Sequence, residues 1–303
     1  MKKIVLVVLL FSTFGINQAQ EWFTNLDVAG RLALVQDKML FVVWEESFNG
    51  SIPVTVRSDA GNTVVIDMAQ DNSLDSVIRE YFVPVRLPES YYADFIKKAE
   101  GRGYAYINKL TDNSIKIMDV NGNIINVDSS MDVEMLQNFR ELVETYALNT
   151  AFLNMELKNY SRDPSCLTAY LLGEKYIEYA IYAKKELRSD IIDLANIYLD
   201  EAERLVPTSN IENIKAVLQK IELAKIEQYL ILDREGKARR QLNRIEPNDI
   251  EEINQRLYAF LQYTILKLQD DDIEAESWKS KISSLDLNKA EMIVNIHKYG
   301  NLN

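Results

Sequence analysis

The stretch KMLFVVWEESFNGSIPV, residues 38–54, decides how the first part of the chain is interpreted. Residues 38–44 form an almost continuous apolar run, rich in β-branched and aromatic side chains, which is typical of a buried central strand. The run ends at Trp44 and continues into a polar loop that contains Gly50. The sequence therefore predicts a buried strand that is followed directly by a loop.

Further strand signals surround this run, up to about residue 128. Residues 54–57 and 63–67 flank the segment SDAGN, whose glycine can adopt the left-handed conformation that a hairpin turn needs. A later segment, FVPVRLP, predicts a strand at an edge or a bulge, because Pro84 has no N–H to donate. Asn121 and Gly122 predict a second hairpin, between two β-rich runs.

Helical segments alternate with these strands. The segments NSLDSVIREYF and ESYYADFIKKAEG place apolar residues at helical spacing, and Gly101 closes the second of them. Strands that alternate with helices indicate an α/β layer, so we expect an α/β domain over residues 21–128.

From about Met131 the pattern is helical to the end, which predicts an all-α domain over residues 131–299. Asp132 is predicted to cap a helix that ends near Tyr146, and Asp163 with Pro164 is predicted to begin another. Because the connections are short, neighbouring helices should form antiparallel hairpins. The remaining helices are predicted at residues 189–205, 211–232, 236–245, 249–268 and 273–285.

Three of these helical segments look alike. Their alanines, Ala202, Ala238 and Ala275, recur at nearly constant intervals, close to the ~34-residue period of tetratricopeptide repeats. The segments lack the tryptophan-leucine-glycine signature of that family. The two alternatives are therefore a tetratricopeptide-like array and an irregular helical bundle.

Residues 21–128 resemble a thioredoxin-like domain in the order of their elements. EWFTNLDVAGRLALVQDKMLFVVWEE is similar to that family's first helix and central strand, FVPVRLPE to its next parallel strand, and NSIKIMDVNGNII to its closing hairpin. The resemblance implies a thiolate at a helix N-terminus after the central strand, with a second cysteine three positions later.

The corresponding loop here departs from that pattern. Its residues Glu45, Glu46, Ser47 and Phe48 include no sulfur, and no cysteine lies anywhere in this half. Asn113 and Ser114 stand where the resemblance implies a cis-proline. We therefore expect a redox-inactive thioredoxin-like domain and predict no catalytic, cofactor-binding or metal-binding residue.

Composition excludes further classes of function. The formal net charge is −12, which argues against nucleic acid and anionic lipid as partners. The only histidine is His297 and the only cysteine is Cys166, so zinc sites made of these residues are excluded. Cys166 is either a small core residue or a single redox thiol.

The first twenty residues have the pattern of a bacterial signal peptide. Lys2 and Lys3 precede an apolar run that is too short to span a bilayer, and a small-residue region ends near Gln20. We expect cleavage near residue 20 and export to the periplasm or the medium, with no transmembrane segment in the mature chain.

The chain contains sixteen tyrosines, and two of them, Tyr176 and Tyr179, are predicted to share one face of a helix. They form either part of the core or a recognition surface, because tyrosine gives a large contact area at low entropic cost. Together these features predict an exported, non-catalytic protein that binds a protein or peptide partner, without a cofactor. Two alternatives stay open: a carboxylate-based hydrolase acting on glycans, whose catalytic groups the sequence does not identify, and a thiol redox partner that uses Cys166 alone. Glu45 and Glu46 suggest a carboxylate pair, but adjacent side chains usually point in different directions, so a solvated loop is the preferred interpretation.

Overall fold

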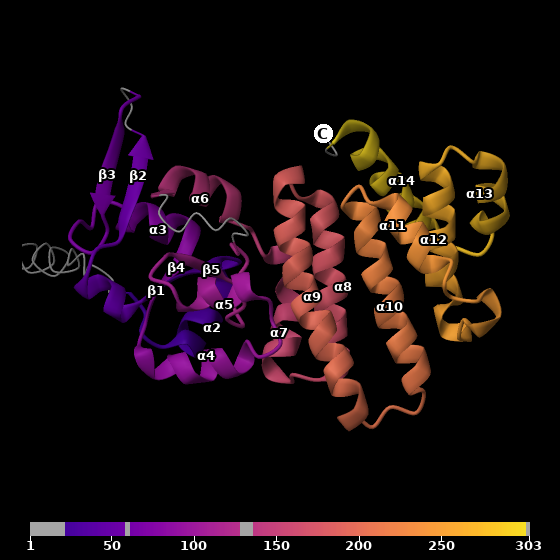
Figure 1. The fold of residues 1–303 in the computed structure, drawn as a ribbon, viewed down its shortest axis with the longest axis horizontal. Helices are drawn as coiled ribbons and strands as arrows, with labels where there is room; N and C mark the ends of the chain where they lie inside the picture. The colour runs from indigo at the N-terminus through magenta and orange to yellow at the C-terminus, as the bar shows by residue number, and fades with distance from the viewer. Residues whose placement is uncertain (1–21, 58–60, 128–135, 301–303) are drawn as a thin grey trace, which may run out of the picture.

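A computed structural model describes residues 22–57, 61–127 and 136–300. The predicted leader, residues 1–20, and the predicted cap Asp132 lie outside these residues. The chain forms a small mixed-sheet region followed by a helical region, and the two lie side by side along the long axis of the molecule (Figure 1).

The first sheet is built around the predicted central strand, β1 (Met39–Trp44), all of whose residues are buried. β4 (Phe82–Leu87) pairs with β1 in parallel, and β5 (Lys116–Met118) pairs with it in antiparallel orientation. The sheet order is β4-β1-β5, so β4 is an edge strand. This confirms the edge position that Pro84 indicated, although Phe23 adds a short parallel bridge beyond β4.

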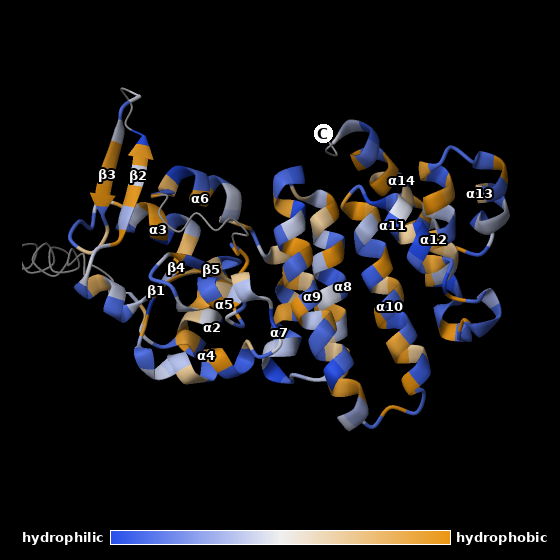
Figure 2. Ribbon diagram, viewed as in Figure 1, coloured by the Kyte–Doolittle hydropathy of each residue, from blue (hydrophilic) through white to orange (hydrophobic). Residues whose placement is uncertain are grey.

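The predicted hairpin forms a second sheet that projects from the body of the molecule (Figure 1). β2 (Pro53–Arg57) pairs in antiparallel orientation with β3 (Thr63–Asp67) and in parallel with β6 (Gln137–Asn138), giving the order β3-β2-β6. Figure 2 shows a largely hydrophobic β3, whereas hydrophobic and hydrophilic residues alternate along β2.

Short helices pack around the two sheets. Three of them, α2 (Leu26–Gln36), α3 (Asp75–Tyr81) and α4 (Tyr92–Lys98), fall within the predicted helical segments. In contrast, α5 (Tyr104–Thr111) was not predicted, and α6 (Phe139–Tyr146) begins at Phe139, behind its N-cap Asn138. The second predicted hairpin is reduced to one bridge between Met118 and Ile124, because the Asp119 side chain closes the turn. The helices of this region are α2 (Leu26–Gln36), α3 (Asp75–Tyr81), α4 (Tyr92–Lys98), α5 (Tyr104–Thr111) and α6 (Phe139–Tyr146).

The helical region pairs successive helices: α8 packs on α9, α10 on α11 and α12 on α13. Its helices are α7 (Asn154–Arg162), α8 (Cys166–Tyr182), α9 (Arg188–Leu205), α10 (Ile214–Ile231), α11 (Glu235–Leu242), α12 (Gln255–Leu268), α13 (Asp272–Lys279) and α14 (Ser284–Tyr299). None of the helices in the described ranges combines the length and the hydropathy that a membrane span requires.

Several predicted helix ends differ from the structure. Ser165 rather than Asp163 caps α8, because its hydroxyl and that of Thr168 form a reciprocal capping box. The helix predicted over residues 249–268 begins only at Gln255, after two short 3-10 turns. The one predicted over residues 273–285 ends at Lys279, and Ser283 then caps α14.

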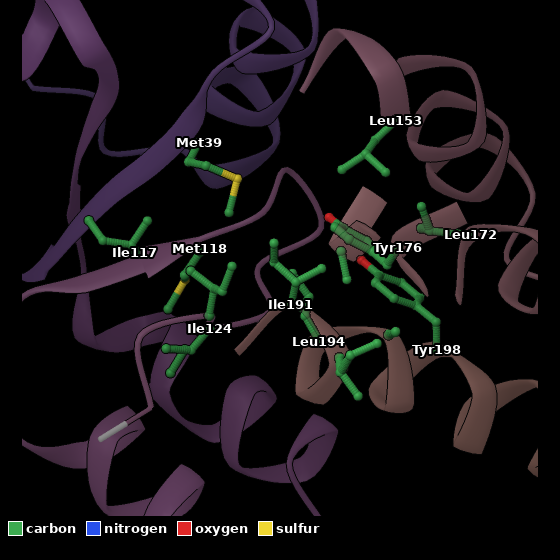
Figure 3. Close-up of a cluster of buried hydrophobic side chains, with 14 of the residues drawn as sticks. Met39, Ile117, Met118, Ile124, Leu153, Leu172, Tyr176, Ile191, Leu194 and Tyr198 are labelled. Carbon is green, nitrogen blue, oxygen red and sulfur yellow. The ribbon is translucent and has the colours of Figure 1, made fainter. Parts of the chain in front are cut away.

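The two regions share buried side chains where α8 and α9 meet β5 and the turn after it (Figure 3). Met118 and Ile124 lie on the sheet side, and Tyr176 and Ile191 lie on the helical side. The regions therefore pack directly against each other.

Candidate functional site

The loop after β1 is the place where the thioredoxin-like resemblance implies a reaction centre. Its residues form a 3-10 turn, η1 (Glu45–Asn49), in which Ser47 is 4% exposed and donates a hydrogen bond to Asn113 Oδ1 at 3.2 Å. The Arg86 guanidinium lies 3.9 Å from the centroid of the Phe48 ring. Glu45 and Glu46 are exposed to solvent. The loop therefore packs Ser47 and part of Phe48 against the body of the protein, and it exposes Glu45, Glu46, Asn49 and Gly50 to solvent.

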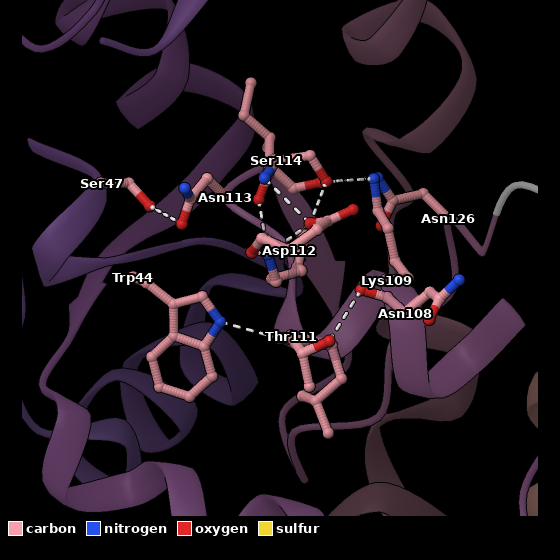
Figure 4. Close-up of polar contacts among 12 residues, drawn as sticks. Trp44, Ser47, Asn108, Lys109, Thr111, Asp112, Asn113, Ser114 and Asn126 are labelled. Carbon is pink, nitrogen blue, oxygen red and sulfur yellow. Dashed lines mark hydrogen bonds and ion pairs between the residues drawn. The ribbon is translucent and has the colours of Figure 1, made fainter. Parts of the chain in front are cut away.

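The turn before β5 lies beside this loop and is held by charged side chains (Figure 4). The Lys109 ammonium donates to Ser114 Oγ at 2.8 Å, and Ser114 Oγ donates to Asp112 Oδ1 at 2.6 Å. Lys116, fully buried, donates to Asp112 Oδ1 at 3.0 Å and to two backbone carbonyls. Burial lowers the pKa of Lys116 to about 8, although Asp112 acts in the opposite direction.

A serine beside a lysine is also a nucleophile and base pair in some hydrolases. Here the Ser114 hydroxyl proton is donated to Asp112, whereas a nucleophile would donate it to a neutral amine. Lys116 forms an ion pair with Asp112, and Lys109 reaches the same carboxylate through Ser114, so these contacts fix the turn before β5.

The two predicted recognition tyrosines lie in different places. Tyr176 is 0% exposed, its ring stacks on Tyr198 with centroids 5.7 Å apart, and its hydroxyl donates to Asp119 Oδ2 at 3.4 Å. Tyr179 is half-buried and donates to the carbonyl of Asn149 at 3.1 Å. Tyr176 is thus a core residue of the junction, and only Tyr179 has an exposed part.

Asp119 is the polar centre of this junction. Its carboxylate accepts hydrogen bonds from the hydroxyl of Tyr198 and from the backbone N–H groups of Asn121 and Asn123, the latter two at 2.9 Å. Complete burial raises the pKa of Asp119, although these hydrogen bonds act in the opposite direction. The Asp-x-Asn-Gly sequence therefore builds a contact between the two regions.

Cys166 begins α8 and is 3% exposed. Burial raises the pKa of its thiol, so the reactive thiolate is disfavoured at neutral pH. This environment does not favour the alternative of a single-cysteine redox partner.

An open groove of ≈ 830 Å³ lies beside α10. Two of its apolar side chains are strongly exposed: Leu167 at 64% and Ile253 at 74%. We call it the α10 groove, and its lining residues are Cys166, Leu167, Tyr170, Ile211, Asn213, Ala216, Val217, Lys220, Glu251, Glu252, Ile253 and Asn254.

Polar contacts fix the walls of the α10 groove. The Asn254 side-chain amide donates to the carbonyl of Ala216 at 2.8 Å and to Gln219 Oε1 at 3.0 Å, which ties the segment before α12 to the first turns of α10. The backbone N–H of Glu251 donates to the same Gln219 oxygen at 2.9 Å. These bonds hold the segment that carries Ile253 against α10 in the absence of a bound partner.

Charged groups lie at the rim of the groove. Lys215 forms an ion pair with Glu251 at 2.9 Å, and the Lys220 ammonium lies 4.9 Å from the centroid of the Tyr170 ring. Glu252 is exposed. An apolar centre with a charged rim is the usual composition of a site that binds a protein segment.

The sequence did not reveal this groove, because its walls come from three separate segments. Leu167 lies in the helix that the sequence predicts from Asp163 onward, and Ile253 lies within the predicted range 249–268, although α12 begins only at Gln255. Within the described residues, no group of three or more His, Cys, Asp or Glu side chains is placed to hold a metal ion.

Comparison with protein-family models, with curated proteins and with solved structures found no match to this chain.

Proposed function

We propose that this is an exported, non-catalytic binding protein that holds an apolar segment of a protein partner in the α10 groove. The exposure of Leu167 and Ile253 on fixed walls carries the proposal. Large apolar side chains that stay in water on a pre-formed groove lower the free energy when a partner covers them. The leader-like residues 1–20 support export to the periplasm or the medium.

We propose that the two regions descend from a thioredoxin-like domain and a tetratricopeptide-like array. The order β4-β1-β5, with β4 parallel and β5 antiparallel to β1, supports the first. The second is supported by the recurring alanines: Ala202, Ala238 and Ala275 are buried on α9, α11 and α13, the second helix of each packed pair. Such arrays bind partners along their surface, which fits a binding role.

A matched pair of substitutions tests the proposed function. The purified protein is coupled to beads and incubated with an extract of the exporting cell's envelope, and bound proteins are quantified by mass spectrometry. Ile253→Glu places a charge on the groove wall, whereas Ile273→Glu makes the same change on α13, where Ile273 is 92% exposed. We expect a specific partner to be retained by the wild type and by Ile273→Glu, and to fall at least tenfold with Ile253→Glu.

The proposal is overturned if the wild type retains no specific partner, or if both substitutions reduce retention equally. Circular dichroism of both variants shows whether they remain folded. Leu167→Glu, on the opposite wall, should reproduce the loss seen with Ile253→Glu, because both side chains border the same groove.

A further inference from the structure

β3 is the outer strand of the second sheet. Among the described residues its only partner strand is β2, on its inner side, and Figure 1 shows its outer side facing away from the molecule. Edge strands of soluble proteins are usually protected by charges, prolines or bulges, since an unpaired edge can pair with another chain. Residues 63–66 of β3 contain none of these, and Val64 and Val65 are 48% and 56% exposed.

The register of the hairpin determines which backbone groups face outward. Pro53, which has no N–H, lies opposite Asp67, and the N–H of Met68 donates to the carbonyl of Ile52 at 3.0 Å. Because hydrogen-bonded and non-bonded pairs alternate in an antiparallel ladder, Val64 and Ile66 bond inward to β2. The N–H and C=O of Val65 therefore point outward.

The outer edge of β3 can pair with the same edge of a second copy of the chain. A two-fold antiparallel pairing centred on Val65 lets the two copies of that residue exchange both backbone hydrogen bonds. On one face it places Val64 opposite Ile66 of the second copy, an aliphatic cross-strand pair of the kind that stabilises sheets. On the other face it places Thr63 opposite Asp67 of the second copy. A shift by one residue would put apolar side chains opposite polar ones and lose this match.

Charge also fits a second copy. Arg57 lies opposite Thr63 within the hairpin, so the paired sheet aligns Arg57, Thr63 and the second copy's Asp67 in one row on one face. The Asp67 carboxylate is held in place by the N–H groups of Ile52 and Ala69, at 2.8 and 3.1 Å. Two such rows form by symmetry, and in each row one copy supplies the positive end and the other copy supplies the negative end.

We propose that β3 is a self-association edge, through which two copies of this chain join their hairpin sheets into one antiparallel sheet centred on Val65. The α10 groove lies in the other region and takes no part in it. The shared edge is short, so we expect association only at high protein concentration, because stable interfaces bury about 1,600 Å².

Single cysteines test the register. In the proposed pair the two Val65 Cα atoms are about 5.5 Å apart, within the range for a disulfide. The two Thr63 residues lie four positions out of register, roughly 14 Å apart. Under mild oxidation, Val65→Cys should form disulfide-linked dimers at least fivefold more efficiently than Thr63→Cys. The wild type, whose Cys166 is buried, gives the background. Equal cross-linking of the two variants would overturn the proposal.

Sedimentation velocity tests the association itself, with a matched pair of charge substitutions. Val65→Lys places a charge at the centre of the edge, whereas Val35→Lys makes the same change on α2, where Val35 is 81% exposed. We expect the average mass of the wild type and of Val35→Lys to rise toward twice the monomer mass with concentration, and Val65→Lys to stay monomeric. A wild type that remains monomeric up to about 1 mM would contradict the proposal, even if the edge captured an unrelated strand peptide.

Discussion

The loop after β1 and the α10 groove differ in what covers their apolar side chains. In the loop, Phe48 contacts the ring of Trp22, with centroids 5.3 Å apart, and the guanidinium of Arg86. In the groove, Leu167 and Ile253 have most of their surface in water. The resemblance to a known reaction centre pointed to the loop, whereas the large exposed apolar side chains lie in the groove.

Burial energies explain why this difference matters. Burying an exposed leucine or isoleucine side chain lowers the free energy by about 1.5–3 kcal/mol, and the α10 groove offers two of them. A partner at the closed loop would have to displace contacts that the chain already makes with itself. Substitutions should therefore lower stability in the closed parts of the molecule and lower binding in the open one.

The largest loss of stability is expected at the junction, the most closed of these places. Asp119→Ala leaves the Tyr198 hydroxyl and the N–H groups of Asn121 and Asn123 buried without their acceptor. We expect unfolding free energy, measured with urea, to fall by about 3–5 kcal/mol. Asp71→Ala removes an exposed carboxylate whose bonding partner among the described residues is Ser73, so it should cost under about 1 kcal/mol. Equal effects would show that the junction contributes little.

The buried Lys116 should make the unfolding free energy depend on pH. Its folded pKa of about 8 lies below the ordinary value of 10.5, so between these pH values the unfolded chain holds a proton that the folded chain has lost. Unfolding free energy should then rise with pH across this window, by on the order of 2–3 kcal/mol. Lys116→Met should remove that rise, whereas Lys97→Met, at an exposed lysine, should retain it. Identical pH profiles for wild type and Lys116→Met would contradict the assignment.

Phe48 tests closure of the loop directly. Phe48→Ala removes the ring that Trp22 and Arg86 contact, and because this side chain is only partly buried we expect a loss of about 2 kcal/mol. Phe48→Leu keeps most of the apolar contact and should lose about half as much. A loss below about 0.5 kcal/mol for Phe48→Ala would mean that the loop is as open as the groove.

The sequence predicted the elements whose signals are local. The apolar run at residues 38–44 predicted β1, and the glycine of SDAGN predicted the β2–β3 hairpin. Pro84 indicated that β4 is an edge strand. Each depends on a few consecutive residues, so periodicity and turn chemistry were sufficient.

The sequence did not predict features that depend on distant residues. The Asp-x-Asn-Gly turn was assigned to a hairpin, but the Asp119 carboxylate bonds the turn's own N–H groups and reaches Tyr198, which lies on α9. Tyr176 was a candidate for the surface, since helical spacing does not tell which face a neighbouring region will cover. The α10 groove was missed for the same reason, because its walls meet only in the folded chain.

The smallest effect on stability is expected at the groove wall. Ile253→Ala removes apolar atoms that are mostly in water, so the unfolding free energy should change by less than about 0.5 kcal/mol. If the proposed function holds, the same variant should weaken partner binding measurably, by about tenfold for a loss near 1.4 kcal/mol of binding free energy. A substitution that leaves the unfolding free energy unchanged but weakens partner binding identifies an exposed binding site. If Ile253→Ala instead lowers stability as much as Phe48→Ala, Ile253 is part of the core. The α10 groove would then be no more open than the loop after β1.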